Sequence, residues 1–436
     1  MKKLRFPLPF QPSFGLAALL LGASLSLTLV GCKKDDDSAT DAGSPGMVVY
    51  IESNLAGANQ NSILAYRHAA DGSLTALPSA PFATSGAGYA NLTQKLGPND
   101  TDEPIALSDD KRRLFAVNQG SNTIAVFDIA TGGQLTPVAG SPFPSGGVNP
   151  ASVGVAGTRL YVVNKNDDGA ATGGRPNYAV FDVGPAGQLT PVAGATVETT
   201  VGASPSHALV APGQRLLFVD DFLAFAAPTP AGTLRAFRIG ADGKLTAAPG
   251  TPLSTAGMGG ALGLWAHPTQ NVLYVGFPME GKVGVYGFDP ATGALTFRTS
   301  VAAGKAACWL RVNRAGTRLY ALNSAESTIS VYDLANPLAP ATLQTFVLKN
   351  PGPLFDSMSP AGMVTSSEPF HEEFSPDEKT LFVVSQHANP DFAGNYNFAH
   401  ALPIGPDGRL AEPGTPLQLP VDSRTRPQGV VSVTTN

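Results

Sequence analysis

Short apolar segments with a central aromatic residue recur along the chain and predict β-strands. Each reads Leu-aromatic-Val-Val-Asn or a close variant, usually after an arginine, and most are followed by a second segment of the form Ser/Thr-Ile-x-Val-Tyr/Phe. Asp-Gly and Pro-Ala-Gly turns between such segments are typical of antiparallel meanders. The first segments begin at Met47, Arg113, Arg159, Arg215, Val272, Arg318 and Thr380, and a Gly-x-Leu signature follows at Gly72, Gly133, Gly187, Gly243, Gly293 and Gly408.

The number of copies predicts the architecture. Seven units between residues 47 and 436 leave about 56 residues for each, slightly above the usual length of a propeller repeat. The segment 426–433 has the pattern of the innermost strand that the first unit lacks before Met47. We therefore predict an all-β, seven-bladed β-propeller of four-stranded antiparallel blades, closed by the C-terminal strand pairing into blade one.

The N-terminal segment has the features of an export signal rather than of the propeller. Lys2, Lys3 and Arg5 precede an apolar run that ends in Leu-Val-Gly before Cys32, which resembles the lipobox of bacterial lipoproteins. A short transmembrane anchor is the alternative. The interpretation divides the chain into a signal peptide (1–31), a lipidated flexible tether (32–46) and the propeller (47–436). It predicts an outer-membrane or cell-surface lipoprotein, lipidated at Cys32 and attached to the membrane only through that lipid.

Composition and charge narrow the function. The chain has 48 glycines and 38 prolines among 436 residues, which argues against coiled coils and helical bundles. A net charge of −5 gives no basic surface for nucleic acid. We find no His-Glu-x-x-His motif and no phosphate-binding glycine loop, so we expect neither a metal nor a cofactor. Cys308 has no second cysteine to pair with in the mature chain, because Cys32 carries the lipid, so we expect no intramolecular disulfide. We expect the protein to be a monomer.

The repeats resemble the Tyr-Val-Thr-Asn propeller repeat, and the folded body resembles the propeller lactonase family that includes 6-phosphogluconolactonase. The segment 205–221, Pro-Ser-His followed by a strand that ends in Asp-Asp, is the closest local match. The resemblance implies hydrolysis of a small lactone or sugar-acid ester.

Loop lengths indicate a functional face. In a four-stranded meander the connections between strands one and two and between strands three and four share one face, and these are short here. The long insertions all fall on the opposite face, at 89–103, 167–177, 222–232, 349–368 and 387–397. Long loops on a rigid scaffold often carry function, so we expect the site there. Drift in a tolerant region is the alternative.

Two polar residues stand out in the predicted innermost strands. Eight positions before the arginine-equivalent residue, blades two to seven carry Ile105, Ala151, His207, Leu264, Leu310 and Glu372. Because polar groups in an apolar column must be hydrogen-bonded or functional, we predict His207 and Glu372 as catalytic residues that clamp a small ligand from separate sides of the axis. The alternative is that they only tie strand ends together. The predicted ligand-binding residues are Asp220, Asp221, His371, His387 and Arg311.

Two functions from different classes follow. The first is an envelope-anchored, lactonase-like propeller that binds and hydrolyses a small lactone or sugar acid. The second is a non-catalytic propeller that binds a glycan or a protein partner at the cell envelope. Loss of lactone opening on substitution of His207 or Glu372 would favour the first.

Overall fold

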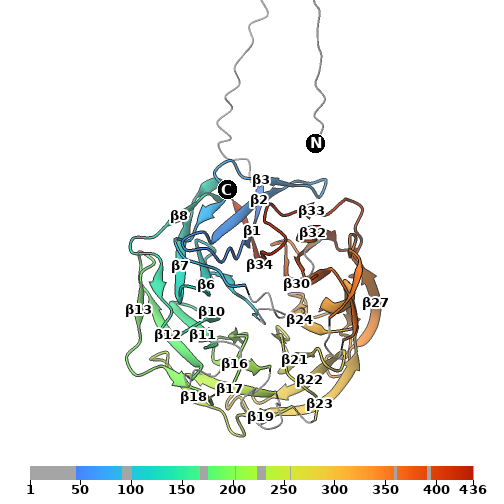
Figure 1. The fold of residues 1–436 in the computed structure, drawn as a ribbon. Coiled ribbons are helices and arrows are strands. Elements are labelled where there is room, and N and C mark those ends of the chain that lie inside the picture. The colour runs from blue at the N-terminus through green and yellow to red at the C-terminus, as the bar shows by residue number, and fades with distance from the viewer. Residues whose placement is uncertain are drawn as a thin grey trace, which may run out of the picture. The chain divides into compact units, whose positions relative to one another are not determined.

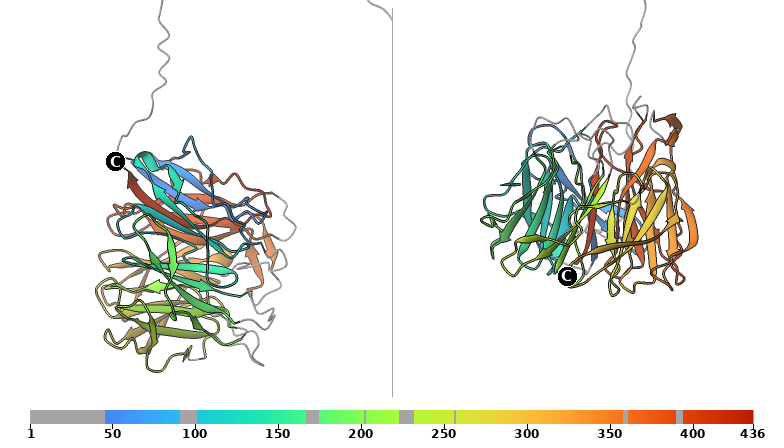
Figure 2. Two further views of the ribbon diagram at one scale, coloured as in Figure 1. Left: turned by 90° about the vertical axis from the view of Figure 1, so that its left-hand side faces the viewer. Right: turned by 90° about the horizontal axis from the view of Figure 1, so that it is seen from below.

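The computed structural model describes residues 46–90, 101–166, 175–201, 203–222, 232–255, 257–357, 361–389 and 394–435. The chain divides into residues 1–42 and a second compact unit, 43–436, which contains all of the described residues. Seven antiparallel sheets are arranged in a ring, as the view along the axis in Figure 1 and the side views in Figure 2 show. The predicted seven-bladed β-propeller is confirmed.

Each sheet is a blade with four strand positions, counted outward from the axis. The innermost strands of blades one to seven are β34 (Gln428–Thr435), β5 (Ile105–Leu107), β10 (Pro150–Ala156), β15 (Leu209–Val210), β20 (Leu264–Ala266), β24 (Ala307–Val312) and β30 (Ser367–Phe374). The second strands are β1 (Gly46–Glu52), β6 (Arg113–Asn118), β11 (Arg159–Asn164), β16 (Leu216–Asp221), β21 (Val272–Phe277), β25 (Arg318–Asn323) and β31 (Thr380–His387).

The outer half of each blade is less regular. The third strands are β2 (Ser62–His68), β7 (Thr123–Ile129), β12 (Asn177–Val183), β17 (Thr233–Ile239), β22 (Lys282–Phe288), β26 (Thr328–Asp333) and β32 (Phe398–Pro403). The outermost position holds two short strands in blades one to four, β3 (Leu74–Ala76) with β4 (Phe82–Ala83), β8 (Leu135–Pro137) with β9 (Phe143–Pro144), β13 (Leu189–Pro191) with β14 (Val197–Glu198), and β18 (Leu245–Ala247) with β19 (Leu253–Ser254). In blades five to seven it holds β23 (Leu295–Ala302), β27 (Ala341–Val347) and β33 (Leu417–Gln418).

Three small elements complete the described part of the fold. A separate hairpin is formed by β28 (Leu354–Asp356) and β29 (Met363–Thr365). Two 3-10 turns lie at Thr131–Gly133 and Ser324–Glu326. The described residues include no helix with the length and hydrophobicity needed to cross a bilayer.

The last strand closes the ring. β34 pairs antiparallel with β1 along the whole of that strand, from Gly46 opposite Thr435 to Glu52 opposite Gln428. The innermost strands also contact one another in a complete circuit, from β34 through β5, β10, β15, β20, β24 and β30 back to β34. The predicted closure by the C-terminal strand is therefore confirmed.

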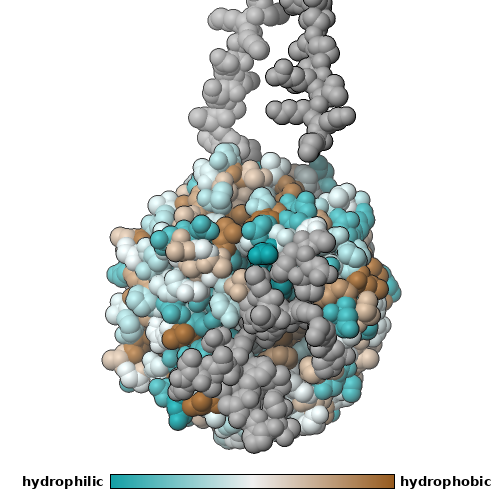
Figure 3. Space-filling model, in the orientation of Figure 1, coloured by the Kyte–Doolittle hydropathy of each residue, from teal (hydrophilic) through white to brown (hydrophobic). Residues whose placement is uncertain are grey.

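The apolar core lies between neighbouring blades. Residues 114–118 of β6 are all buried, because each blade is packed between two others and both of its faces are covered. This explains why the second strands have continuous apolar runs rather than alternating ones. On the face shown in Figure 3, hydrophobic and hydrophilic side chains of the described residues are mixed, and the hydrophobic areas are small and scattered.

A repeated contact between blades explains two sequence signatures together. The aromatic residue of a second strand donates its hydroxyl to a backbone carbonyl of the next blade, as Tyr50 does to Gly133 at 2.8 Å and Tyr320 does to Gly408 at 2.8 Å. The arginine that begins a second strand packs against the same glycine of the next blade. At Gly408 any side chain would clash, because a Cβ there would be 2.5 Å from Nε of Arg318. Blade six lacks Gly-x-Leu, and there Tyr274 bonds to the carbonyl of Pro337 instead, at 2.9 Å.

Candidate functional site

One residue from each innermost strand faces the axial channel, and the register of the strands identifies it. In all seven blades it lies opposite the equivalent residue of the second strand, such as Phe115, Tyr274 or Tyr320. In blades one to four these residues are small or aliphatic, whereas blades five to seven supply a tryptophan, an arginine and a glutamate. In blade order they are Val431, Ala106, Gly154, Val210, Trp265, Arg311 and Glu373.

These residues line a cavity of about 660 Å³ that continues into a deeper part of about 330 Å³. The mouth of the cavity is formed by Asp109, Gln214, Arg314 and Glu378, and each of these residues belongs to a short turn between an innermost and a second strand. We expected the site among the long insertions on the opposite face. In the described residues the cavity instead opens among the short turns.

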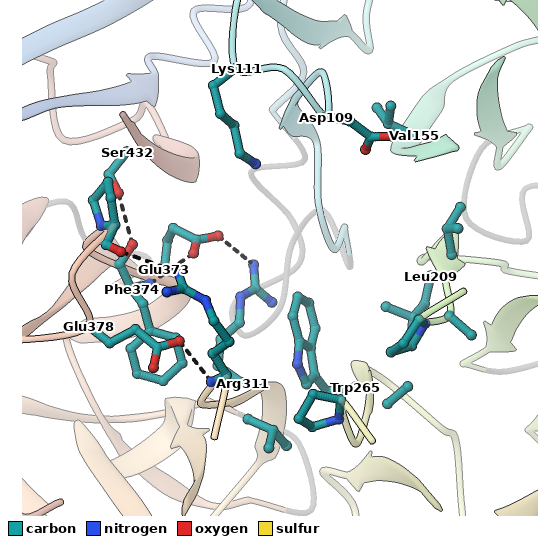
Figure 4. A pocket seen from close by; sticks show the side chains of 18 of the residues that line it. Asp109, Lys111, Val155, Leu209, Trp265, Arg311, Glu373, Phe374, Glu378 and Ser432 are labelled. Carbon is teal, nitrogen blue, oxygen red and sulfur yellow. Dashed lines mark hydrogen bonds and ion pairs between the residues drawn. The ribbon is translucent and has the colours of Figure 1, made fainter. Parts of the chain in front are cut away.

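Figure 4 shows how the cavity is divided. Trp265 and Arg311 lie side by side on one wall, with the guanidinium carbon 4.0 Å from the centre of the indole ring. Nη2 of Arg311 is 3.6 Å from Oε2 of Glu373. Leu209 and Val155 form an apolar wall across the cavity, and the amino group of Lys111 points into the space between the walls. Among the innermost strands, the charged and aromatic side chains that face the cavity therefore come from blades five to seven.

Glu373 can act as an acid or a base near neutral pH. Burial raises the pKa of its carboxyl to about 7, and the opposing effect of Arg311 limits that rise. Glu103 raises this pKa further and Lys111 lowers it. A carboxyl that is about half ionised near pH 7 is suited to proton transfer.

The deep end of the cavity is occupied by the segment Thr101–Glu103, which we call the axial segment. Its backbone accepts two hydrogen bonds at Thr101, from Nε1 of Trp309 at 2.7 Å and from the ring of His371 at 3.0 Å. The amide of Asp102 donates to the carbonyl of Ser206 at 3.0 Å. Trp309 adopts a left-handed φ of 45°, which is costly for an aromatic residue and directs its indole to this segment. Three blades thus hold the axial segment at the axis.

His207 lies against the axial segment and lines the deeper cavity. Its Nδ1 is 2.9 Å from Oδ2 of Asp102 and 3.3 Å from the amide of Leu264. The shorter contact to a carboxylate favours a proton on Nδ1 that is donated to Asp102. Burial opposes the charged imidazole, but Asp102 outweighs burial and raises the pKa of His207 above its ordinary value. His207 and Asp102 therefore form a buried ion pair.

His207 and Glu372 were predicted because both lie eight positions before the arginine-equivalent residue, but they do not occupy equivalent positions in the structure. Leu264, Leu310 and Glu372 lie opposite equivalent residues of their second strands, Val275, Ala321 and Val383. In blade four the residue at this position is Leu209, opposite Phe218. The hairpin of blade four pairs Val210 with Leu217, so His207 lies one layer deeper toward the long-loop end. The expected clamp on a ligand by the pair His207 and Glu372 is therefore not formed.

Glu372 belongs to a packing position. It lines neither described part of the cavity, and it is 1% exposed. Neither of its carboxylate oxygens has a hydrogen-bond partner among the described residues. Burial raises its pKa well above the ordinary value, which favours the protonated, uncharged carboxyl. The neighbouring Glu373 has the channel-facing position that we assigned to Glu372.

The other predicted site residues are fixed by the protein itself. His371 is held between the carbonyl of Thr101 and the amide of Gly429, and burial lowers its pKa to about 3. Asp221 accepts a hydrogen bond from Thr233 and forms an ion pair with Arg235, both at 2.8 Å.

Asp220 and His387 also have structural partners. Asp220 accepts hydrogen bonds from Oγ of Ser206 at 2.7 Å and the amide of Gly263 at 2.8 Å, and burial raises its pKa to about 6. His387 stacks on Tyr396 with ring centres 5.5 Å apart, in a second strand that does not line the cavity. Of the predicted residues, Arg311 and His207 line the cavity, and Cys32 lies outside the described residues.

Several residues that make the site polar were not predicted from the sequence. Trp265 and Glu373 each follow a residue of the chosen column directly, so the alternation along a strand could have identified them. Asp102 and Glu103 come from a long insertion, and nothing in the local pattern places these two residues at the axis.

Comparisons with known proteins agree with this fold. A family model described as "Lactonase, 7-bladed beta-propeller" matches residues 251–388. A sequence search of curated proteins finds no match. The structure of a periplasmic gluconolactonase from Pseudomonas aeruginosa is 17% identical, with a TM-score of 0.65, and covers 90% of this chain and 100% of its own.

A candidate 6-phosphogluconolactonase from Bacteroides fragilis is 16% identical, with a TM-score of 0.64, and covers 91% of this chain and 100% of its own. At such identities the structural likeness supports the fold alone. The resemblance inferred from the repeats is nevertheless confirmed, since residues 251–388 match the family of seven-bladed β-propeller lactonases and the complete ring has the fold of that family.

Proposed function

We propose that the protein binds a small lactone or sugar acid in the axial cavity and hydrolyses the lactone there. The observation that carries the proposal is the run of Trp265, Arg311 and Glu373 at equivalent positions of three consecutive blades, opposite small and aliphatic residues in the others. A large aromatic face, a fixed cation and a carboxyl that titrates near neutrality are the groups that lactone opening needs.

The geometry suggests a role for each group. The indole of Trp265 packs against the apolar face of a sugar ring. The guanidinium of Arg311 stabilises the negative charge that develops on the carbonyl oxygen when water attacks. The carboxylate of Glu373 takes a proton from that water, the bond between the acyl carbon and the ring oxygen breaks, and the proton passes to the leaving alkoxide. The product is the open hydroxy acid, so atoms and charge balance.

Turnover of a panel of lactones by the purified protein tests the proposal. Glu373→Gln removes the base and keeps the size of the side chain, so we expect the rate to fall by about 10²–10⁴-fold. Glu372→Gln is the matched control, because its carboxyl is next in sequence but lies outside the cavity. Equal turnover in wild type and Glu373→Gln would refute this site. Binding of the lactone without turnover in the wild type would favour a non-catalytic ligand-binding propeller.

We also propose that the protein is exported and anchored through a lipid on Cys32, with residues 1–31 removed and residues 32–46 as the tether. The sequence around Cys32 supports this assignment. Metabolic labelling with a fatty-acid analogue should label the wild type and leave Cys32→Ala unlabelled. Labelling of both chains, or of neither, would contradict it.

A further inference from the structure

We propose that Asp102, Glu103 and His207 form a binding site for a divalent first-row transition metal such as Mn²⁺ or Zn²⁺. Each residue offers one ligand atom, and these atoms all lie within 4.8 Å of one another. Two atoms that bind the same ion at about 2.0–2.4 Å can be at most about 4.8 Å apart, so the three fit around one ion. One imidazole nitrogen and two carboxylates suit Mn²⁺ or Zn²⁺ better than Ca²⁺ or Mg²⁺.

The state of Asp102 points independently to a missing partner. The residue is 1% exposed, and Oδ1 of its carboxylate has no hydrogen-bond partner among the described residues. Its polar neighbour is His207, whose Nδ1 is 2.9 Å from Oδ2. One imidazole cannot satisfy two carboxylate oxygens, and a buried carboxylate with free lone pairs is costly. A cation between Asp102 and its neighbours, which would displace the proton of the His207 imidazole on binding, would remove that cost.

The surroundings orient the three ligands and leave a path to them. Arg311 contacts Oε1 of Glu103, which leaves Oε2 of that carboxylate for an ion. Contacts of this kind between a ligand and a second residue are common around metal sites, because they fix the position of the ligand. Both Glu103 and His207 line the deeper cavity, so an ion can enter from the mouth at the short turns.

A metal at this place would change what the cavity can do. Three protein ligands leave coordination positions for water or for an oxygen atom of a bound ligand, as in catalytic rather than structural metal sites. These positions would lie at the deep end of the cavity, beneath Arg311 and Glu373. The site does not depend on lactone hydrolysis, since the three ligands and the path to them exist whatever molecule the cavity accepts.

Calorimetric titration of the chelator-treated full-length protein with MnCl₂ tests the proposal. We expect one Mn²⁺ per chain and a Kd in the micromolar range, with the electron paramagnetic resonance spectrum of Mn²⁺ changed on binding. Asp102→Asn should weaken binding by about 10–100-fold or abolish it. Asp109→Asn is the control, because this exposed aspartate at the mouth of the cavity carries the same charge outside the proposed ligand set.

The proposal is overturned if the wild type binds no Mn²⁺, or if Asp102→Asn and Asp109→Asn bind it equally. If Asp102→Asn does not fold, Glu103→Gln replaces it, because the side chain of Glu103 is 16% exposed and tolerates change more easily. Mn²⁺ should also raise the Tm of the wild type and leave that of the ligand variants unchanged. Because these measurements contain no lactone, their result is separate from the test of Glu373.

Discussion

Glu52 is the strongest test of how burial controls the stability of the propeller. It ends β1 beside the closing strand and is fully buried. Its carboxyl accepts hydrogen bonds from Asn61 at 2.7 Å and from Gln428 at 3.4 Å. Burial nevertheless raises its pKa from 4.5 to about 8, so the folded protein keeps this carboxyl protonated at neutral pH. Glu52→Gln replaces the protonated acid by a neutral side chain of the same size.

The sign and the size of the effect follow from this pKa. The unfolded chain loses the proton near pH 4.5 and the folded chain near pH 8, so the stabilisation is complete below pH 4.5 and is lost as the pH rises to about 8. Each pH unit in that window removes about 1.4 kcal/mol from the free energy of unfolding, which amounts to about 5 kcal/mol over the whole range.

Urea unfolding of wild type and Glu52→Gln between pH 4.5 and 8 measures the effect. Asp220 and Glu373 have raised pKa values as well and add slopes of the same sign, so the difference between the two proteins isolates Glu52. We expect Glu52→Gln to gain stability relative to the wild type with rising pH. The exposed Glu198 provides the control, since Glu198→Gln should keep the wild-type slope. Parallel pH profiles for wild type and Glu52→Gln would refute the argument.

Three further predictions concern the contacts between blades, the base and the ring closure. Gly133→Ala places a Cβ 2.6 Å from Val48 and should lower the free energy of unfolding by about 1–3 kcal/mol more than Gly250→Ala does, because Gly250 has a similar positive φ but no atom within 4 Å of an added Cβ. Urea unfolding of the two variants measures this difference, and equal losses of stability would contradict the prediction. Lactone turnover by the wild type should rise with pH through about 7 as Glu373 ionises; the charged groups that act on this carboxyl are Arg311, Glu103 and Lys111. A pH profile of turnover that stays flat across pH 7 would exclude Glu373 as the base. Deletion of residues 428–435 removes an inner strand and should abolish the near-ultraviolet circular dichroism of the fold, so a native spectrum would show that closure is dispensable.

The architecture could be predicted from the sequence because it depends on local, repeated signals. The second strands are buried on both faces, so each leaves a continuous apolar run such as Leu114–Val117 that is easy to recognise. The predicted closing segment, 426–433, overlaps β34, which pairs with β1 as expected from Gln428 onward. Such signals are independent of what the distant parts of the chain do.

The site was predicted less well, for two physical reasons. Side chains alternate along a strand, so an error of one residue exchanges Glu373, which faces the cavity, for Glu372, which packs between blades. In blade four the hairpin register shifts His207 by two residues, and a fixed offset cannot anticipate this. The axial segment is positioned by Trp309, Ser206 and His371, and such long-range contacts leave no periodic trace in the sequence.

The pairing of β1 with β34 has a consequence for assembly. It joins residues as far apart in sequence as Gly46 and Thr435, so blade one stays incomplete until the last strand has emerged from the ribosome. Until then β1 presents an unpaired edge to other nascent chains. A β34 strand supplied by a neighbouring molecule would satisfy that edge equally well, and crowded rings could therefore become linked by strand exchange.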